Sequence, residues 1–411
     1  MTKRDHWSHW LITALMFALS FAVFYALAQR PSSDLSIHAA WASEGNFADP
    51  RSFMHHVVHP LWHVMVAAVL LTGLPLAASA ALVTALWKAA EVWLLIAISA
   101  RLLGKNGWLP ALCGLTLSLV SAVLVPAVNP TVYLGAGSPN TWHSPTQIAA
   151  LTMMLICLPM VADTVEDFHR RLPLEGEKTT ISVRRAMLLS ALLVISLLAK
   201  PTFMQAFLPA ACLYFLVMWI RRPKNGTFFW RMVAVAAPSV VLMVLQSLYY
   251  FWFYSAAQGG SAILLVTWQK AGGVAVQVLL TRAFPLFVLL TCAKRDIWRK
   301  PIYQLGLLMD AISILEMLLL SETGRRAADG NFSWAMMGSA LMLWTLTLPL
   351  FVREAQNWFH SRAILADGRV RLEGRTATGT LRLVTGSALL LWHLASGIYY
   401  IVYLMTTTRS L

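Results

Sequence analysis

Residues 60–74 read PLWHVMVAAVLLTGL, and the sidedness of everything after them depends on whether this stretch crosses a membrane. A helix needs about 20 predominantly apolar residues to span a bilayer core. This stretch is shorter and is followed by Pro75, a residue that interrupts helices. We therefore predict a short external helix that lies at the membrane surface or re-enters it.

The rest of the chain is far more apolar than a soluble domain. Of its 411 residues, 58% are hydrophobic and 12% are charged, whereas about a quarter of a soluble domain is charged. Segments that approach or reach the length of a membrane span recur along the chain, at 10–29, 76–100, 108–128, 146–162, 185–199, 203–220, 228–253, 273–293, 302–320, 333–352 and 384–406. The sequence predicts an all-α polytopic membrane protein: one integral membrane domain over 1–411, with about eleven transmembrane helices and short external juxtamembrane helices.

The distribution of Lys and Arg orients these helices. With a cytoplasmic N-terminus, the expected cytoplasmic ends and loops hold 23 of the 32 Lys and Arg residues, as the positive-inside rule requires. A full span at 60–74 would reverse the sides of all later loops and remove this bias. We therefore expect an external loop over 30–75 and a cytoplasmic loop over 353–383. A cleaved signal peptide over the first 29 residues is an alternative, but the length of the apolar run favours a retained helix.

Several classes of protein are excluded or disfavoured. The net charge of +14 is spread along the chain and is explained by topology, so we expect no nucleic acid partner. The four cysteines fall in apolar segments without metal-type spacing and imply no disulfide framework. The sequence holds no GxxxxGK[ST] loop and no GxGxxG after a strand, which disfavours an ATP-driven transporter subunit or a cytosolic nucleotide-sugar domain.

The uncommon polar residues fall on the predicted external side. They lie in several short loops, and the candidates are Asp34, His38, His59, His63, Asn140, Trp142, His143, Lys200, Lys270, Glu322, Arg325, Arg326 and Asn331. The loop GSPNTWHSPT, residues 137–146, combines prolines with an Asn, a Trp and a His, and a Trp ring suits a membrane interface or a sugar. We expect one external site, built from loops on a helical scaffold.

Each candidate also has a structural interpretation. Asp34 is either a helix cap or a carboxylate that acts as general base or binds a metal. Lys200 either complements the negative end of a helix or contacts a phosphate. The pair Arg325 and Arg326 is either a solvated turn or a guanidinium clamp on an anionic headgroup. These alternatives stay open at the level of sequence.

The histidines of HHVVHPLWH raise the question of a metal. His55, His59 and His63 are four apart and would share one face if the stretch were helical. Pro60 interrupts such a helix, and no HExxH motif is present. We predict hydrogen-bonding histidines and no resident metal or cofactor, with a divalent metal as the alternative.

Charged residues also lie within the expected spans, where they are functional candidates by default. Lys88 and Glu91 are three apart and can neutralise one another, whereas Asp310 and Glu316 lie in the ninth expected helix. These few residues do not form the relay of acidic groups that is typical of a proton-coupled transporter.

The layout of the first hundred residues has a known counterpart. An N-terminal helix is followed by an external acidic residue, Asp34, then by an HPLW segment at 59–62, and then by a helix that ends in the basic turn ARLLGK at 100–105. This layout resembles the GT-C superfamily of membrane glycosyltransferases, which includes protein O-mannosyltransferases and aminoarabinose lipid A transferases. The phrases SPNTWHSPT, AKPTF and ETGRRAADGNFSW also look like motifs of polytopic proteins of bacterial surface-polysaccharide gene clusters.

The resemblance implies a reaction and roles for the candidates. Such enzymes move a sugar from a polyprenyl-phosphate donor to a glycan or lipid acceptor on the extracytoplasmic face, here of a bacterial inner membrane. Asp34 would be the base, with Glu322 as its substitute, because the acceptor hydroxyl must lose a proton. The departing phosphate would be held by cations, namely Lys200, Arg325 and Arg326, with Lys270 or Arg282 as further candidates. The remaining candidates, Asn140, Trp142 and His143 foremost, would contact the sugar or the acceptor.

Three rival functions remain. A surface-polysaccharide polymerase relies on arginines in large external loops, whereas the loops here are short. A lipid-linked saccharide flippase or secondary transporter should show internal repeats and interrupted helices, and the sequence holds no repeat. A scaffold protein is the least specific alternative, and the cytoplasmic side shows no docking motif.

Overall fold

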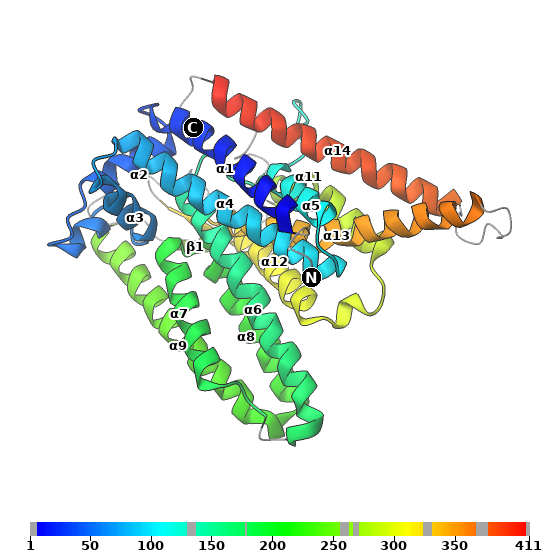
Figure 1. The fold of residues 1–411 in the computed structure, drawn as a ribbon. Coiled ribbons are helices and arrows are strands. Elements are labelled where there is room, and N and C mark those ends of the chain that lie inside the picture. Colours follow the sequence, from blue (N-terminus) through cyan, green and yellow to red (C-terminus); the bar gives the residue numbers. More distant parts are fainter. Residues whose placement is uncertain are drawn as a thin grey trace.

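The computed structural model describes residues 6–129, 137–176, 179–254, 263–265, 271–323, 331–366 and 377–407. Helices form nearly all of it (Figure 1). The helices are α1 (Trp7–Ala28), α2 (Asp34–Ser43), α3 (Leu61–Leu70), α4 (Leu76–Leu103), α5 (Trp108–Leu119), α6 (Pro145–Glu175), α7 (Val183–Ala199), α8 (Thr202–Arg221), α9 (Gly226–Leu248), α11 (Ala271–Cys292), α12 (Pro301–Leu319), α13 (Ser333–Ala366) and α14 (Ala377–Thr406), with short 3-10 turns η2 (Pro50–Met54), η4 (Pro223–Asn225) and η7 (Ile297–Arg299) and a π-helical turn η5 (Tyr249–Tyr254). Two short strands, β1 (Ile263–Leu265) and β2 (Leu320–Glu322), pair antiparallel with Leu264 opposite Ser321.

The predicted fold class is confirmed. Among the described residues, nine helices are long and apolar enough to cross a membrane: α1, α4, α6, α8, α9 with the turn before it, α11, α12, α13 and α14. The shorter α7, of 17 residues, runs beside α9 and corresponds to the expected span 185–199. Of the expected spans, only 108–128 has no counterpart among these helices. The chain is thus a multi-pass membrane protein.

The stretch at 60–74 forms a short helix, as predicted. α3 has 10 residues and begins directly after Pro60. Its Trp62 is fully buried and donates a hydrogen bond from Nε1 to Thr84 of α4 at 3.1 Å. A helix of this length covers about half of a bilayer core, so α3 packs on α4 without being a span of its own.

One expected span, 108–128, is helical only in its first half. α5 ends at Leu119, and the chain then runs extended and mostly buried through residues 120–125. The stretch VSAVLV is rich in β-branched residues and precedes Pro126, which disfavours helical geometry for the residue before it. The predicted helix over 120–128 is therefore wrong.

The polar backbone of this extended stretch is satisfied by neighbouring helices. Ser121 N donates to the carbonyl of His393 in α14 at 3.2 Å, and Ser121 O lies 2.6 Å from Nδ1 of the same histidine. Leu124 N donates to Oγ of Ser396 at 3.0 Å. Irregular backbone at membrane depth is tolerated only where it is buried in protein and its hydrogen bonds are made. α14 meets that condition here.

The close approach of α14 to this stretch depends on Gly397. A Cβ at this position would lie 1.6 Å from the carbonyl oxygen of Leu119. We therefore expect Gly397→Ala to destabilise the protein by about 1–3 kcal/mol or more, because backbone must move. Thermal unfolding in detergent measures the loss. Gly273→Ala in α11, where a Cβ meets nothing within 4 Å, is the matched control; equal unfolding temperatures for the two variants would contradict the prediction.

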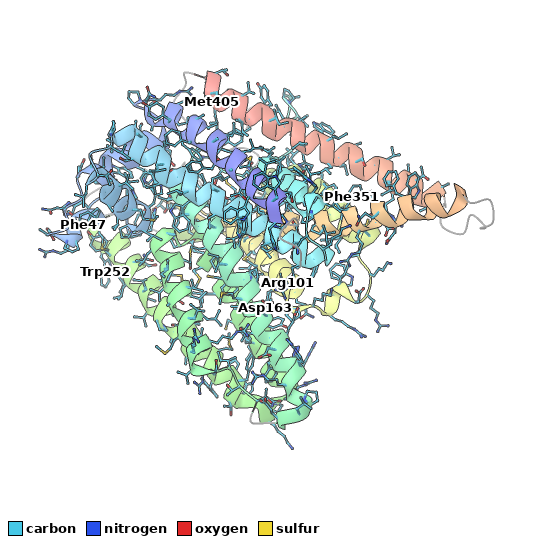
Figure 2. All side chains as sticks on the ribbon, viewed as in Figure 1. Phe47, Arg101, Asp163, Trp252, Phe351 and Met405 are labelled. Atoms are coloured by element: carbon cyan, nitrogen blue, oxygen red, sulfur yellow. The ribbon has the colours of Figure 1, made fainter. Side chains whose placement is uncertain are left out.

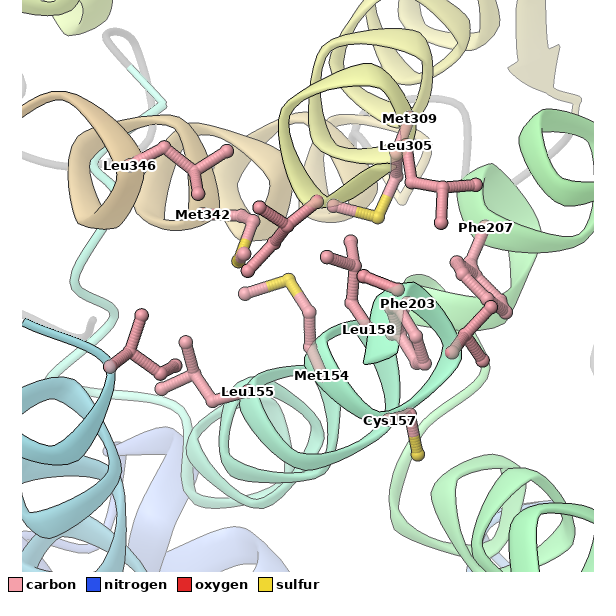
Figure 3. Packing of buried hydrophobic residues seen from close by; sticks show 14 of the residues in the cluster. Met154, Leu155, Cys157, Leu158, Phe203, Phe207, Leu305, Met309, Met342 and Leu346 are labelled. Atoms are coloured by element: carbon pink, nitrogen blue, oxygen red, sulfur yellow. The ribbon is translucent and has the colours of Figure 1, made fainter. Parts of the chain in front are cut away.

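The main hydrophobic core lies between α6, α8, α12 and α13. Figure 3 shows Met154 and Leu158 of α6 facing Met309 of α12 and Met342 of α13, with Phe203 of α8 closing the side. Of the nine long apolar helices, α13 is the most enclosed: 94% of its apolar segment is buried inside the protein. The corresponding share for α9 is 22%. α13 is therefore central, and helices such as α9 present most of their surface to lipid.

Arginine side chains are held by different groups at the two ends of the bundle. At one end, Arg101 at the C-terminal end of α4 forms an ion pair with Asp163 of α6 (Figure 2), and Arg382 of α14 pairs with Glu354 of α13 at 3.0 Å. At the other end, Arg30 after α1 donates to the last carbonyls of α14. The stretch 353–383, expected to be a loop, continues α13 to Ala366 and contains the start of α14.

Candidate active site

The short helix α2 presents a carboxylate that is not used as its cap. The cap is Ser33, whose Oγ accepts a hydrogen bond from Ser36 N at 3.0 Å. Asp34 is thus the first residue of the helix, where the dipole favours its negative charge. Its carboxylate is turned toward His38, one turn later, with Oδ1 3.4 Å from Nε2. The interpretation of Asp34 as the cap of this helix is therefore excluded.

A pair of histidines joins α2 to α3 behind this carboxylate. Nδ1 of His38 and Nε2 of His63 are 2.8 Å apart. An ionised carboxylate only accepts hydrogen bonds, so His38 donates to Asp34 through Nε2. Burial above all, together with the charge of His38, holds the pKa of His63 well below its usual range, so His63 is neutral. Asp34, His38 and His63 form one hydrogen-bonded chain.

The carboxylate of Asp34 is ionised and accessible. Burial by itself would raise its pKa, but the charge and hydrogen bond of His38, with the charges of His143 and Lys200, hold that pKa well below the usual range. The side chain keeps 31% of its surface exposed. A persistent negative charge therefore stands at an opening of the molecule.

A cavity of about 400 Å³ lies between α8, α9, α12 and the start of α13. Asp34 is not part of its lining, but it interacts electrostatically with Lys200, which is. Its polar lining comes from separate parts of the chain: His59, Lys200, Thr202, Gln205, Gln246, Ser247, Tyr250, Glu316, Glu322 and Asn331. Its apolar lining includes Pro201, Pro209, Met243, Leu320 and Trp334. A cavity of this size with a mixed lining suits an amphipathic ligand.

Lys200 supplies the positive charge of the cavity. It follows α7 directly, and its Nζ lies 4.0 Å from the centroid of the Trp334 ring. Burial lowers the pKa of Lys200 to about 8, although the negative charge of Asp34 partly opposes this shift. The ammonium is thus charged at neutral pH but weakly hydrated, which favours pairing with an anion.

His59 and the pair Glu322 and Asn331 complete the polar lining. Burial first, and then the charge of Lys200, holds the pKa of His59 well below its usual range. Its buried Nδ1 has no hydrogen-bond partner within the described residues. Across the cavity, Nδ2 of Asn331 donates to Glu322 at 2.6 Å, and Tyr250 donates to the same carboxylate at 3.4 Å. A neutral imidazole and a fixed carboxylate therefore face the same space.

The loop GSPNTWHSPT contributes less to this site than its composition suggests. Asn140 is fully buried: its Oδ1 accepts from Lys88 at 2.9 Å, and its Nδ2 donates to carbonyls at the end of α5. Trp142 is 1% exposed and lies under the Lys88 ammonium, 4.8 Å from its ring centroid. Both residues surround the intramembrane ion pair of Lys88 with Glu91, and neither lines the cavity.

His143 is the member of this loop that reaches the site. Its Nδ1 lies 2.6 Å from the hydroxyl of Tyr400, and its ring is 5.6 Å from that of Trp334. Burial lowers the pKa of His143 to about 4, although Asp34 partly opposes the shift, so the imidazole is neutral at pH 7. His143 therefore joins the groups around Asp34 and Lys200.

The remaining candidates are placed as follows. Lys270, Arg325 and Arg326 lie outside the described residues. Arg282, a further phosphate candidate, is fully buried in α11 and bound to Asp310, so it does not face the cavity. His55 and His59 precede α3, so the helix face that a metal site on the three histidines required does not form. Within the ranges that the structure describes, no three His, Cys, Asp or Glu side chains group as metal ligands.

Some residues of the cavity are not among the predicted site residues. Thr202, which lines the cavity, donates a hydrogen bond to Gln147 of α6 at 2.9 Å. Gln147 donates to the carbonyl of Trp334 at 3.1 Å and so supports the wall beside Lys200 without lining the cavity itself. Gln246 of α9 donates to the carbonyl of Val58 next to His59. Both glutamines lie inside expected spans, and polar residues there usually face the interior of a bundle. Their position in the sequence could therefore have identified them as candidates.

No known protein family matches the sequence, and no curated protein matches it. The structure is similar to that of ArnT from Cupriavidus metallidurans in the apo state, with 13% sequence identity and a TM-score of 0.47 over 96% of this chain and 75% of that chain. It is also similar to ArnT from Cupriavidus metallidurans bound to undecaprenyl phosphate, with 12% identity and a TM-score of 0.46 over 96% and 74% of the two chains.

Proposed function

We propose that the protein is a membrane glycosyltransferase that moves a sugar from a polyprenyl-phosphate donor to a glycan or lipid acceptor on the extracytoplasmic face of a bacterial inner membrane. The observation that carries the proposal is the cavity of about 400 Å³ with Lys200 in its wall, together with the ionised Asp34 that interacts electrostatically with Lys200. Its mixed lining suits a phosphate on an apolar chain. The resemblance of the sequence to the GT-C superfamily supports the same reaction.

The positive charge of Lys200 and the negative charge of Asp34 suit the two parts of the reaction, which are departure of the phosphate and attack by the acceptor. As the bond from the sugar to the phosphate breaks, negative charge grows on the phosphate, and Lys200 stabilises it. As the acceptor oxygen bonds to the sugar, its proton passes to Asp34. The low pKa of Asp34 makes it a weak base in the empty site. The negative charge of a bound phosphate opposes the charge of Lys200 and so moves that pKa upward, although the larger lowering by His38 remains.

The histidine chain positions the carboxylate. His38 holds Asp34 through Nε2 and is itself bonded to His63. Because the Nε2 proton of His38 faces the carboxylate, this chain orients Asp34 and keeps it an acceptor for the proton of the acceptor hydroxyl. Among the described residues, Glu322 is one of two carboxylates in the cavity lining, with Glu316, and Asn331 fixes its orientation.

The sidedness of the site rests on charge. The candidate residues lie at the end of the bundle that holds Arg30, whereas the basic turns after α4, α8 and α11 lie at the other. The positive-inside rule therefore supports a cytoplasmic N-terminus and a site on the external face.

We expect the capture of donor to fall as the pH rises through about 8, the pKa of Lys200 in the free protein. Below that pH the ammonium is charged and binds phosphate, and above it the charge is lost. The pH profile of kcat/KM measures this, since it reports groups of the free enzyme. In Lys200→Arg the guanidinium stays charged, so its decline should move to higher pH. An alkaline limb unchanged in this variant would contradict the role of Lys200.

The proposal is tested by a mass profile of surface glycans and lipid-linked intermediates from cells that lack the protein, carry the wild type or carry Asp34→Asn. Loss of the same sugar or branch in the deletion and in the variant is the expected result. Accumulation of complete single repeat units would indicate a polymerase instead. An unchanged profile would overturn the transferase proposal and favour transport.

A further inference from the structure

A second cavity, of about 790 Å³, lies at the opposite end of the bundle from the candidate active site. It is formed where the ends of α6 and α8 meet the start of α9 and of α12. α8 runs from Thr202 at the first cavity to Arg221 at the second, and its 20 residues span about 30 Å. The two cavities are thus separated by about the thickness of a bilayer core.

One wall of this cavity is aromatic and apolar. Phe168 of α6 stacks on Phe228 of α9 with 4.0 Å between ring centroids, and Trp219 of α8 stacks on Phe229 at 4.7 Å. Val217 of α8 also lines the cavity and is 45% exposed. Because α8 is a membrane-spanning helix, this apolar wall continues toward the lipid.

The other part of the lining is cationic. Arg221 and Arg222 at the end of α8 and Arg299 of η7 line the cavity, and among the described residues no carboxylate lines it. Some other described arginines at this end are held by protein groups, as Arg101 is by Asp163 and Arg382 is by Glu354. By contrast, no hydrogen bond or ion pair within the described residues holds the side chains of these three.

A buried donor at the same place also lacks a partner. Asn225, in the turn between α8 and α9, lines the cavity, and its Nδ2 is buried without a hydrogen-bond partner among the described residues. A buried amide donor left unpaired costs free energy, so such a group indicates a missing ligand or water. Three guanidinium groups beside it select an anion, and phosphate matches their fork geometry.

We propose that this cavity binds the phosphate headgroup of an anionic membrane lipid, with Arg221, Arg222 and Arg299 around the phosphate and the acyl chains along the aromatic wall. Basic pockets between spanning helices at the cytoplasmic face are a known form of lipid recognition. A free phosphate would use the cations but leave the apolar wall without a role. The site lies about 30 Å from the transfer site by the length of α8 and does not depend on the proposed function.

The test measures lipid binding to the full-length protein by native mass spectrometry. The probe is dioleoyl-phosphatidylglycerol, and dioleoyl-phosphatidylcholine serves as the zwitterionic comparison. We expect Arg222→Gln/Arg299→Gln to weaken phosphatidylglycerol binding about tenfold, because two charge-assisted contacts are lost. The matched control is Lys294→Gln/Arg295→Gln, which removes the same charge from exposed positions at the same end but outside the cavity. It should change binding by less than about twofold, because neither residue lines the cavity.

Three results would overturn the proposal. Equal weakening in both double variants would indicate diffuse attraction to the basic end of the bundle. Equal binding of the two lipids to the wild type would remove the role of the anionic headgroup. Displacement of phosphatidylglycerol by inorganic phosphate at millimolar concentration, with the phosphate itself bound as tightly, would make the cavity a site for free anions.

Discussion

Asp34→Asn should lower the rate of sugar transfer by about 10²–10⁴-fold, the range that general acid–base groups contribute. The amide oxygen still accepts the hydrogen bond of His38, and Ser33 still caps α2. The variant should therefore fold and insert like the wild type, because it loses the charge and the proton acceptor but little else. The measurement is the rate of transfer by purified protein, together with its unfolding temperature in detergent.

A nearby carboxylate provides the control for this result. Asp49 lies in the same segment between α1 and α3, its side chain is 48% exposed, and within the described residues that side chain forms an ion pair only with Arg51. Asp49→Asn should leave transfer within about twofold of the wild type, because an exposed ion pair contributes little. Transfer by Asp34→Asn at more than a tenth of the wild-type rate would reject Asp34 as the base and direct attention to Glu322.

Arg282→Met should destabilise the fold by about 3–5 kcal/mol, the cost of leaving one partner of a buried ion pair without the other. Nε of Arg282 lies 3.1 and 3.0 Å from the two oxygens of Asp310, and Nη2 lies 2.6 Å from Oδ1. Ser339 also donates to this carboxylate at 2.7 Å. The pair ties α11 to α12 in the core, so its loss should lower the unfolding temperature in detergent.

Removal of both charges separates the cost of an unpaired charge from the value of the pair. Arg282→Met/Asp310→Leu leaves apolar side chains of similar size, and such replacements are often neutral. We expect the double variant to be more stable than Arg282→Met alone. If Arg282→Met unfolds like the wild type, or if the double variant is less stable than the single one, the pair is not what holds these helices together.

The spans could be predicted because their signal is local. Apolar runs place α1, α4 and α8 within a few residues of their observed ends, and the length of α3 follows from Pro60 and Pro75. The end of α5 could not be predicted with the same certainty. Residues 120–125 are apolar enough for a helix, but they run extended because His393 and Ser396 of α14 satisfy their backbone. That partner is distant in the sequence.

The candidate site was predictable in part for a similar reason. Residue type and sidedness brought Asp34, His59, Lys200 and Glu322 together, since uncommon polar residues in loops at one end must share that end. Asn140 has the same composition signal but is bound to Lys88, a residue of α4. Only the packing of α4 against the loop 137–146 shows that Asn140 binds the buried Lys88 and does not face a ligand.

The extended stretch at 120–125 also sets an order of events during synthesis. Ser121 and Leu124 bond to side chains of α14 that lie 272 residues later in the chain. Val123 and Val125 bond to Leu280 of α11 and to Asn129, but until the ribosome has delivered α14 the backbone groups of Ser121 and Leu124 lack their partners and must stay with water or the insertion machinery. A nascent chain that ends before α14 therefore cannot close the middle of the bundle.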